Sequence, residues 1–253
     1  MTQQTAAADY GNWVSSKFIY GPAMLGALFL ALSFLHPAFT IGAVLFFALA
    51  IYFVYARHTF SPRGRNVQAK LWEVVLDHLD WDGKGQVLDI GCGNGALTIA
   101  LVQRHTDARV TGIDTWGKAW DYSKAVCERN AEDAGVAGRT TFQKASAADL
   151  PFEEGTFDAA ISNFVFHDVN DTMDKRALVQ EALRVVKKGG RFAFQDLFLS
   201  KGLYGDKDDL LETIAGWGIA EVSFVDTSAS NFVPAALKLP FMVGKAAIIY
   251  GTK

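Results

Sequence analysis

The chain has 253 residues, half of them hydrophobic, and a formal net charge of −3. It lacks the Lys and Arg density that binds phosphate backbones, so we expect no nucleic-acid partner. Its two cysteines, Cys92 and Cys127, favour a reducing compartment over a disulfide framework. The length allows one large domain, or one domain with an appendage.

A long uncharged stretch follows the polar N-terminus. No Asp, Glu, Lys or Arg occurs from Phe18 to Ala56, a run of about 58 Å as helix, close to two crossings of a ~30 Å hydrocarbon core. Because Pro37 breaks the run at its middle, we predict two transmembrane helices, at about 18–35 and 38–56. The alternatives are a cleaved signal peptide and a buried helical hairpin of a soluble protein.

Basic residues follow the second predicted helix directly: Arg57, Arg63, Arg65 and Lys70. They predict that this end is cytoplasmic, so that two crossings leave both termini and the remaining domain in the cytoplasm. Glycines in both helices would let them approach closely, within one chain or between the chains of a homo-oligomer. Tyr10 and Trp13 suit either a membrane interface or a lid over a site.

The rest of the chain alternates strands with helices. We place the domain boundary near residue 62, which divides the chain into an anchor, 1–62, and a domain, 63–253. The alternation predicts an α/β fold with a doubly wound, mostly parallel seven-stranded Rossmann-like sheet, preceded by the two transmembrane helices. We expect the last strand to run antiparallel and an apolar insertion at about 230–243. Expected strands are 86–90, 109–114, 140–144, 157–162, 191–196, 219–226 and 245–251.

A glycine-rich turn is the strongest local signal. The sequence Val87-Leu88-Asp89-Ile90-Gly91-Cys92-Gly93-Asn94-Gly95 is a short buried strand, then glycines at alternate positions, then a predicted helix from Ala96. Glycines there let backbone approach a ligand, and the helix N-terminus points its amides back at the turn. The alternative is a tight strand–helix turn that binds nothing.

A second carboxylate lies at the end of the next predicted strand. Asp114 follows a little over 20 residues after the first glycine, where a carboxylate can accept hydrogen bonds from a ribose diol. The alternative is an Asp that caps the following helix.

The motif from Val87 to Gly95 resembles motif I of the class I S-adenosylmethionine-dependent methyltransferases. The resemblance covers roughly residues 66–253. Within the family, the sequence pattern is similar to that of the small-molecule methyltransferases of ubiquinone and menaquinone biosynthesis. In a dinucleotide-binding fold, which uses similar turns, the acid before the first glycine would repel the pyrophosphate.

The resemblance implies S-adenosylmethionine as the cofactor. It implies that Asp89 holds the methionine end and that Asp114 binds the ribose hydroxyls. The backbone of the turn would approach the cofactor closely, and two residues would lie beside the adenine. The further implied cofactor residues are Gly91, Cys92, Gly93 and Asn94 in the turn, and Thr115 and Trp116 after Asp114.

This chain departs from the family pattern on the adenine side. The family's usual Asp aligns with Ser146, so that a hydroxyl would meet the adenine amino group, or Asp149 would substitute. We expect Ser146 and Ala147 to lie beside the adenine.

The residues after the fourth predicted strand face the transferred methyl group in this family. Asn163 would contact the methionine end of the cofactor. His167 is the candidate catalytic residue, because an imidazole titrates near neutrality and could deprotonate or orient a nucleophile. Its alternative is a packing or capping histidine.

These signals together predict a membrane-anchored methyltransferase that transfers a methyl group in line to a small hydrophobic or lipid-associated acceptor. We expect no metal site. The Asn/Asp-Pro-Pro-aromatic signature of nucleic-acid and glutamine amino-methyltransferases is missing from the sequence. The rival interpretation is a membrane scaffold or sensor whose methyltransferase-like domain binds the cofactor without catalysis.

Overall fold

A computed structural model describes residues 8–117 and 122–253. The chain divides into two compact units, which we call the hairpin unit, Gly11–Leu71, and the sheet unit, Trp72–Lys253 with the described residues before Gly11. The sequence placed the boundary near residue 62. The helix α3 (Val67–His78) spans the actual division, and the residues just before the hairpin return to the sheet unit.

Seven strands form one sheet in the order β3-β2-β1-β4-β5-β7-β6. Strands β1 to β5 pair with one another in parallel, whereas β7 runs antiparallel to both β5 and β6. The predicted mostly parallel sheet and its antiparallel last strand are therefore confirmed. The strands are β1 Gly85–Ile90, β2 Ala108–Asp114, β3 Thr140–Lys144, β4 Phe157–Asn163, β5 Val186–Asp196, β6 Glu221–Asp226 and β7 Ala247–Thr252.

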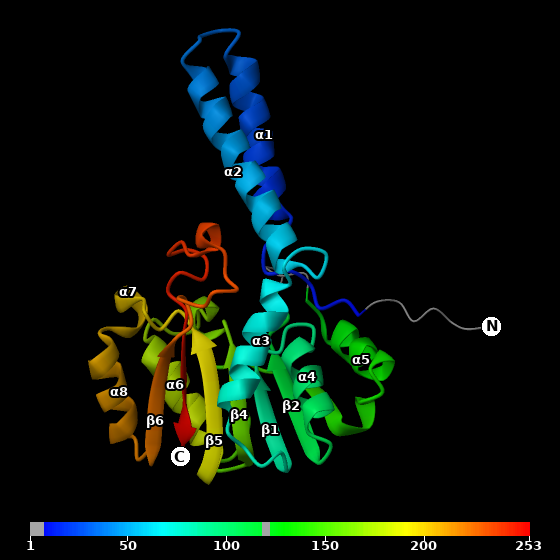
Figure 1. The fold of residues 1–253 in the computed structure, drawn as a ribbon, viewed down its shortest axis with the longest axis vertical. Helices are drawn as coiled ribbons and strands as arrows, with labels where there is room; N and C mark the ends of the chain where they lie inside the picture. The colour runs from blue at the N-terminus through cyan, green and yellow to red at the C-terminus, as the bar shows by residue number, and fades with distance from the viewer. Residues whose placement is uncertain (1–7, 118–121) are drawn as a thin grey trace, which may run out of the picture. The chain divides into compact units, whose positions relative to one another are not determined.

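Helices cover both faces of this sheet (Figure 1). One face packs against α3, α4 and α5, and the other against α6, α7 and α8. The helices are α4 Ala96–Arg104, α5 Lys124–Asp133, α6 Lys175–Arg184, α7 Lys201–Tyr204 and α8 Lys207–Gly216, and the short 3-10 turns are η1 Ala137–Arg139, η2 Phe166–Asp168 and η3 Ala235–Leu237.

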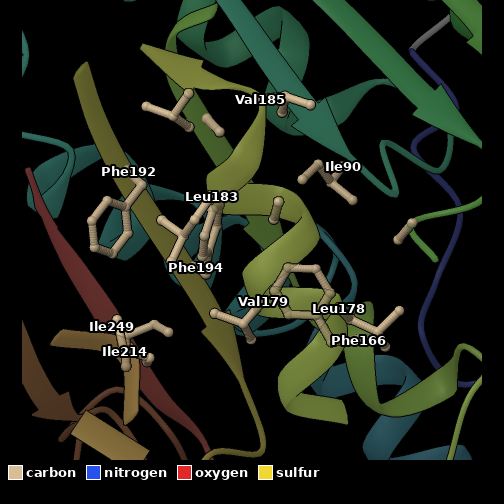
Figure 2. Close-up of a cluster of buried hydrophobic side chains, with 14 of the residues drawn as sticks. Ile90, Phe166, Leu178, Val179, Leu183, Val185, Phe192, Phe194, Ile214 and Ile249 are labelled. Atoms are coloured by element: carbon tan, nitrogen blue, oxygen red, sulfur yellow. The ribbon is translucent and has the colours of Figure 1, made fainter. Parts of the chain in front are cut away.

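Helix α6 illustrates how sequence pattern becomes packing. Asp174 caps it by accepting a hydrogen bond from the backbone of Arg176, and its buried side chains recur along one stripe that faces the sheet. Figure 2 shows part of this stripe, with Leu183 near Phe194 of β5 and Leu178 near Phe166 of η2. Each such buried side chain stabilises the fold by about 1.5–3 kcal/mol.

The strand order reverses between β1 and β4. Ile90 at the end of β1 lies beside Ser162, whose hydroxyl donates to the Ile90 carbonyl at 3.0 Å. Ligands of open α/β sheets bind beyond the carboxyl ends of the strands at such a switch point. The fold therefore directs the glycine turn, which follows β1, toward the position expected for a ligand.

The hairpin unit contains two apolar helices, α1 (Lys17–Leu32) and α2 (Phe39–Phe60). They pack at glycines: a Cβ atom at Gly42 would lie 2.3 Å from the Phe29 ring, and one at Gly26 would lie 3.0 Å from the Phe47 ring. The expected close approach of the helices is therefore present at these two positions. A Cβ atom at Gly21 would have nothing within 4 Å, so this glycine takes no part in the close approach.

The two helices of the hairpin unit differ in length. The 22 residues of α2 extend about 33 Å, enough to cross a bilayer, whereas the 16 residues of α1 extend about 24 Å. Among the described residues one helix, Phe39–Phe60, is both long and apolar enough to span a membrane, and 17% of its most apolar window is buried. Two membrane-spanning helices are therefore not confirmed by length and composition.

The apolar insertion predicted at 230–243 lies between β6 and β7 and contains the short turn η3. Its buried members are Val233, Leu237 and Val243, whereas Phe241 is 64% exposed. Because β6 runs parallel to β5 across the antiparallel β7, the insertion leaves the sheet at the same edge as the glycine turn.

Candidate functional site

The turn after β1 has the backbone shape that its glycines predict. Gly91, Gly93 and Gly95 all have positive φ, at 73°, 57° and 82°. A Cβ atom at Gly91 would lie 2.2 Å from the Val165 side chain, so this position requires glycine for space as well as conformation. Helix α4 begins directly after Gly95, and its N-terminal amides face the turn.

Asp114 ties the end of β2 to this turn. One carboxylate oxygen accepts the Gly93 backbone N–H at 3.0 Å, and the other accepts that of Trp116 at 2.7 Å. Burial raises the pKa of Asp114, and these backbone hydrogen bonds oppose the rise. The proposed alternative of a helix cap is wrong, because Ser123 caps the next helix, α5.

Trp116 also binds the turn, through the Gly93 carbonyl. Its indole N–H donates to the Gly93 carbonyl at 2.9 Å, and its own φ of 43° is in the left-handed region that tryptophan rarely adopts. The Cys127 thiol from α5 donates to the same carbonyl at 3.0 Å. The turn is thus shaped by side chains from β2's end and from α5.

Asp89 is a buried carboxyl group that forms no ion pair among the residues the structure describes. It is 1% exposed, and the Thr98 hydroxyl donates to it at 2.6 Å. Burial raises the pKa of Asp89 to about 7, and the negative charge of Asp114 adds to the rise, while the Thr98 hydrogen bond opposes it. A ligand that brings an ammonium group would stabilise the charged form.

Asn163 offers a second unsatisfied group at the same edge of the sheet. Its Oδ1 atom is buried and has no hydrogen-bond partner among the described residues. Buried polar atoms are normally paired, so an orphaned acceptor indicates a missing donor. The glycine turn, the buried acid Asp89 and this acceptor therefore fit a ligand with a cationic, hydrogen-bond-donating end.

Ser146, which we predict to lie beside the adenine, binds a carboxylate that the sequence did not reveal. Ser146 is half-buried, and its hydroxyl donates to the carboxylate of Asp171, from the loop after β4. Asp171 thus brings a negative charge to the position where the family pattern has its own Asp. Asp149, the expected substitute, forms a bridge with Ser146 through the backbone and is exposed.

The remaining predicted cofactor residues differ in what they can offer. Cys92 and Ala147 are buried in the hydrophobic clusters, whereas Thr115 is exposed. Asn94 is 2% exposed, and both polar atoms of its side chain already bind the chain itself, at Asp9 and Ser123.

His167 forms a charged pair with a residue that sequence reasoning missed. Its Nδ1 lies 2.8 Å from Oδ1 of Asp196, which ends β5 and is fully buried. Backbone N–H groups of Val165 and Leu197 also donate to the Asp196 carboxylate, at 3.0 and 2.6 Å. These contacts hold the imidazole at the carboxyl end of β4.

The pair controls the charge on His167. Burial by itself would lower the pKa of His167, but the carboxylate of Asp196 outweighs burial and raises that pKa to about 9. The imidazole is therefore protonated at neutral pH, and the pKa of Asp196 is lowered in turn despite its burial. A protonated imidazole donates hydrogen bonds and cannot accept a proton.

Comparison with known proteins identifies a domain type for this arrangement. Residues 88–194 match the family model described as a methyltransferase domain. An O-methyltransferase of Aspergillus nomiae, rstn1, is 34% identical over 122 residues, which are 47% of this chain and 50% of that protein. The 27-O-demethylrifamycin SV methyltransferase of Amycolatopsis mediterranei is 30% identical over 156 residues, 60% of this chain and 54% of that protein.

The chain thus spans about half the length of the curated relatives it matches. A solved structure of geranyl diphosphate C-methyltransferase from Streptomyces coelicolor A3(2), in complex with Mg²⁺, geranyl diphosphate and S-adenosyl-L-homocysteine, has a TM-score of 0.54. It is 18% identical, and the match covers 74% of this chain and 78% of that one. At that identity the likeness shows a shared fold.

Proposed function

We propose that the whole protein is a membrane-anchored, S-adenosylmethionine-dependent methyltransferase of class I for a small hydrophobic or lipid-associated acceptor. The match of residues 88–194 to the model of a methyltransferase domain supports the proposed activity. The observation that carries the proposal is the combination, in one chain, of the glycine-turn site with a hairpin whose apolar side chains are exposed. The relatives named as an O-methyltransferase and as a 27-O-demethylrifamycin SV methyltransferase support a small-molecule acceptor, whereas other curated relatives are ribosomal RNA methyltransferases.

S-adenosylmethionine, when bound, would supply a methyl group activated by its positively charged sulfur. The chain's own residues then have to bind, align and exclude water. Asp89 and Asn163 would receive the ammonium end, and Asp114 would accept the ribose hydroxyls. Ser146 with Asp171 would accept the adenine amino group.

His167 would orient the acceptor. With Nδ1 bound to Asp196, the ring presents Nε2 as its second donor, 3.7 Å from the half-exposed Asp168. Because the imidazole is protonated at neutral pH, it would hold an acceptor oxygen that is already ionised. Of the two roles expected from the sequence, orientation of the nucleophile is therefore favoured over its deprotonation by His167.

The hairpin supports a membrane location. Large apolar side chains are exposed along both helices, including Met24, Ile41 and Ile51 at 74%, 67% and 69%. Exposed apolar surface of this extent is typical of a membrane or protein interface. Arg57 lies in the last turn of α2, and Arg63, Arg65 and Lys70 follow that helix, so the positive-inside tendency favours a cytoplasmic sheet unit.

Two crossings fit the chain path better than one. Asp9 and Tyr10, just before the hairpin, belong to the same compact unit as Trp72, just after it. If α2 alone crossed the bilayer, those two segments would lie on opposite sides. A two-pass hairpin with both termini cytoplasmic avoids this conflict. Because the helix faces are exposed, we also predict that the hairpins of separate chains can associate into a homo-oligomer.

The test is a methyl-transfer screen. The full-length protein is incubated with S-adenosylmethionine labelled on its methyl group and with membrane-lipid and small-molecule extracts. We expect a labelled, lipid-soluble product. If S-adenosylhomocysteine binds but no extract yields a product, the result favours the rival interpretation of a scaffold or sensor. A labelled product confined to water-soluble metabolites would contradict the hydrophobic acceptor.

A further inference from the structure

The backbone of Asp9 is bound to the cofactor turn by two asparagines. The Asp9 N–H donates to Oδ1 of Asn130 at 3.1 Å. The Asp9 carbonyl accepts hydrogen bonds from Nδ2 of Asn94 at 3.1 Å and from Nδ2 of Asn130 at 3.0 Å. These three hydrogen bonds, which we call the N-terminal clasp, join residues 85 and 121 positions apart in the sequence.

The two asparagines are buried, at 2% and 1% exposure for Asn94 and Asn130. Buried amide groups require hydrogen-bond partners, and here the partners are backbone atoms of the N-terminal segment and of the turn. Nδ2 of Asn130 also donates to the Asn94 carbonyl at 3.0 Å, and Oδ1 of Asn94 accepts from the Ser123 backbone at 3.1 Å. Undocking Asp9 would remove one hydrogen bond from the Asn94 amide and two from the Asn130 amide.

The clasp ends on the backbone that the cofactor must approach. Asn94 lies between Gly93 and Gly95, and Gly93 is itself held by Asp114 and Trp116. Asn130, on α5, contacts both the N-terminal segment and this turn. The turn is therefore braced on one side by β2's end and on the other by the clasp.

We propose that the N-terminal clasp positions the cofactor turn, with Asn130 as the positioning residue, so that docking of Asp9 and binding of S-adenosylmethionine strengthen each other. By thermodynamic reciprocity, the factor by which docking tightens the cofactor equals the factor by which the cofactor tightens docking. The proposal concerns cofactor binding and does not depend on the membrane or on the acceptor.

Tyr10 secures the clasp from the other end. Its ring packs edge-on against Trp72, with ring centroids 5.9 Å apart, and joins the hydrophobic cluster on the α3 face. A substitution at Tyr10 therefore weakens docking of the segment without touching the turn. This provides a second way to test the coupling.

The first test is Asn130→Asp in the full-length protein. The new carboxylate can still accept the Asp9 N–H, but its other oxygen would face the carbonyls of Asp9 and Asn94. We expect the affinity for S-adenosylhomocysteine, measured by isothermal titration calorimetry, to fall about 5- to 50-fold. The matched control is Glu132→Gln, an exposed position on the same helix, for which we expect no change in affinity.

The second readout is hydrogen exchange of residues 8–12 with and without saturating S-adenosylhomocysteine. We expect the ligand to slow exchange in the native protein, and Tyr10→Ala both to speed exchange and to weaken binding. A purely structural role for Asn130 would lower stability without a ligand-dependent change in exchange. Unchanged affinity in a folded Asn130→Asp protein, or in Tyr10→Ala with faster exchange, would overturn the proposal. If Asn130→Asp does not fold, Tyr10→Ala decides.

Discussion

The carboxyl group of Asp89 creates a conflict between stability and binding. Its pKa is about 7 in the folded protein, against 3.8 for an unperturbed Asp. Between these values the folded state holds more protons than the unfolded state, so the free energy of unfolding falls as pH rises from about 4 to 7. A cationic ligand bound at Asp89 would offset the cost of the buried charge.

Asp89→Asn should separate the two effects. We expect the free energy of unfolding to rise at pH 8 by about 1–3 kcal/mol, because the buried charge is removed while the Thr98 hydrogen bond is kept, and to change little near pH 4. Affinity for S-adenosylmethionine should fall at the same time. Urea denaturation at both pH values and calorimetry check this, with the exposed Asp107→Asn as the control. A less stable protein at pH 8 would contradict it.

Asp196→Asn should change the titration of His167. Without the buried carboxylate, burial and the charge of Lys175 lower the pKa of the imidazole and Asp168 raises it, so the titration midpoint should drop from about 9 toward the ordinary value of 6.5. The pair in the native protein contributes stability that is complete below about pH 6.5 and is lost as pH rises through about 9. NMR titration of the ring carbon signals, assigned with His167→Gln, measures the midpoint.

Activity offers a second check on the same pair. If the protonated imidazole orients the acceptor, methyl transfer should decline above about pH 9 in the native protein and at lower pH in Asp196→Asn. A rate that instead rises through pH 9 would show that His167 acts as a base.

At the scale of elements, the hairpin depends on two glycine contacts. Gly42→Ala places a Cβ atom 2.3 Å from the Phe29 ring, and we expect it to destabilise the α1–α2 packing by about 1–3 kcal/mol. Gly21→Ala, where nothing lies within 4 Å, should leave packing unchanged and favour the helix slightly. Thermal unfolding in detergent, followed by circular dichroism, compares the two. Equal midpoints would mean that the helices do not pack at Gly42.

At the scale of the whole molecule, the number of membrane crossings can be measured. The native cysteines Cys92 and Cys127 are buried, so an introduced cysteine can be labelled selectively. In sealed cells, we expect Leu35→Cys, in the loop between α1 and α2, to react with a membrane-impermeant thiol reagent. Ala8→Cys should react only after the cells are opened. Labelling of both positions in sealed cells would contradict the two-pass topology.

The sequence by itself determined the features that depend on neighbours along the chain. The uncharged run, the strand–helix alternation and the acid before the glycine turn are local patterns, because helices and strands impose fixed periods on burial. The strand β3 and the antiparallel β7 were predicted for this reason. The apolar hairpin was also predicted, and membrane crossing by either of its helices stays a prediction.

The tertiary structure decided which distant side chains meet. Asp196 pairs with His167 across 29 positions because β5 lies beside β4 in the sheet. Asp171 reaches Ser146 across 25 positions. Asp9 returns to Asn130 after 121 positions. A hydrogen bond needs atoms within about 3 Å in the right direction, and no periodicity in a sequence specifies that. The charge on His167 and the bracing of the cofactor turn are therefore properties of the folded chain alone.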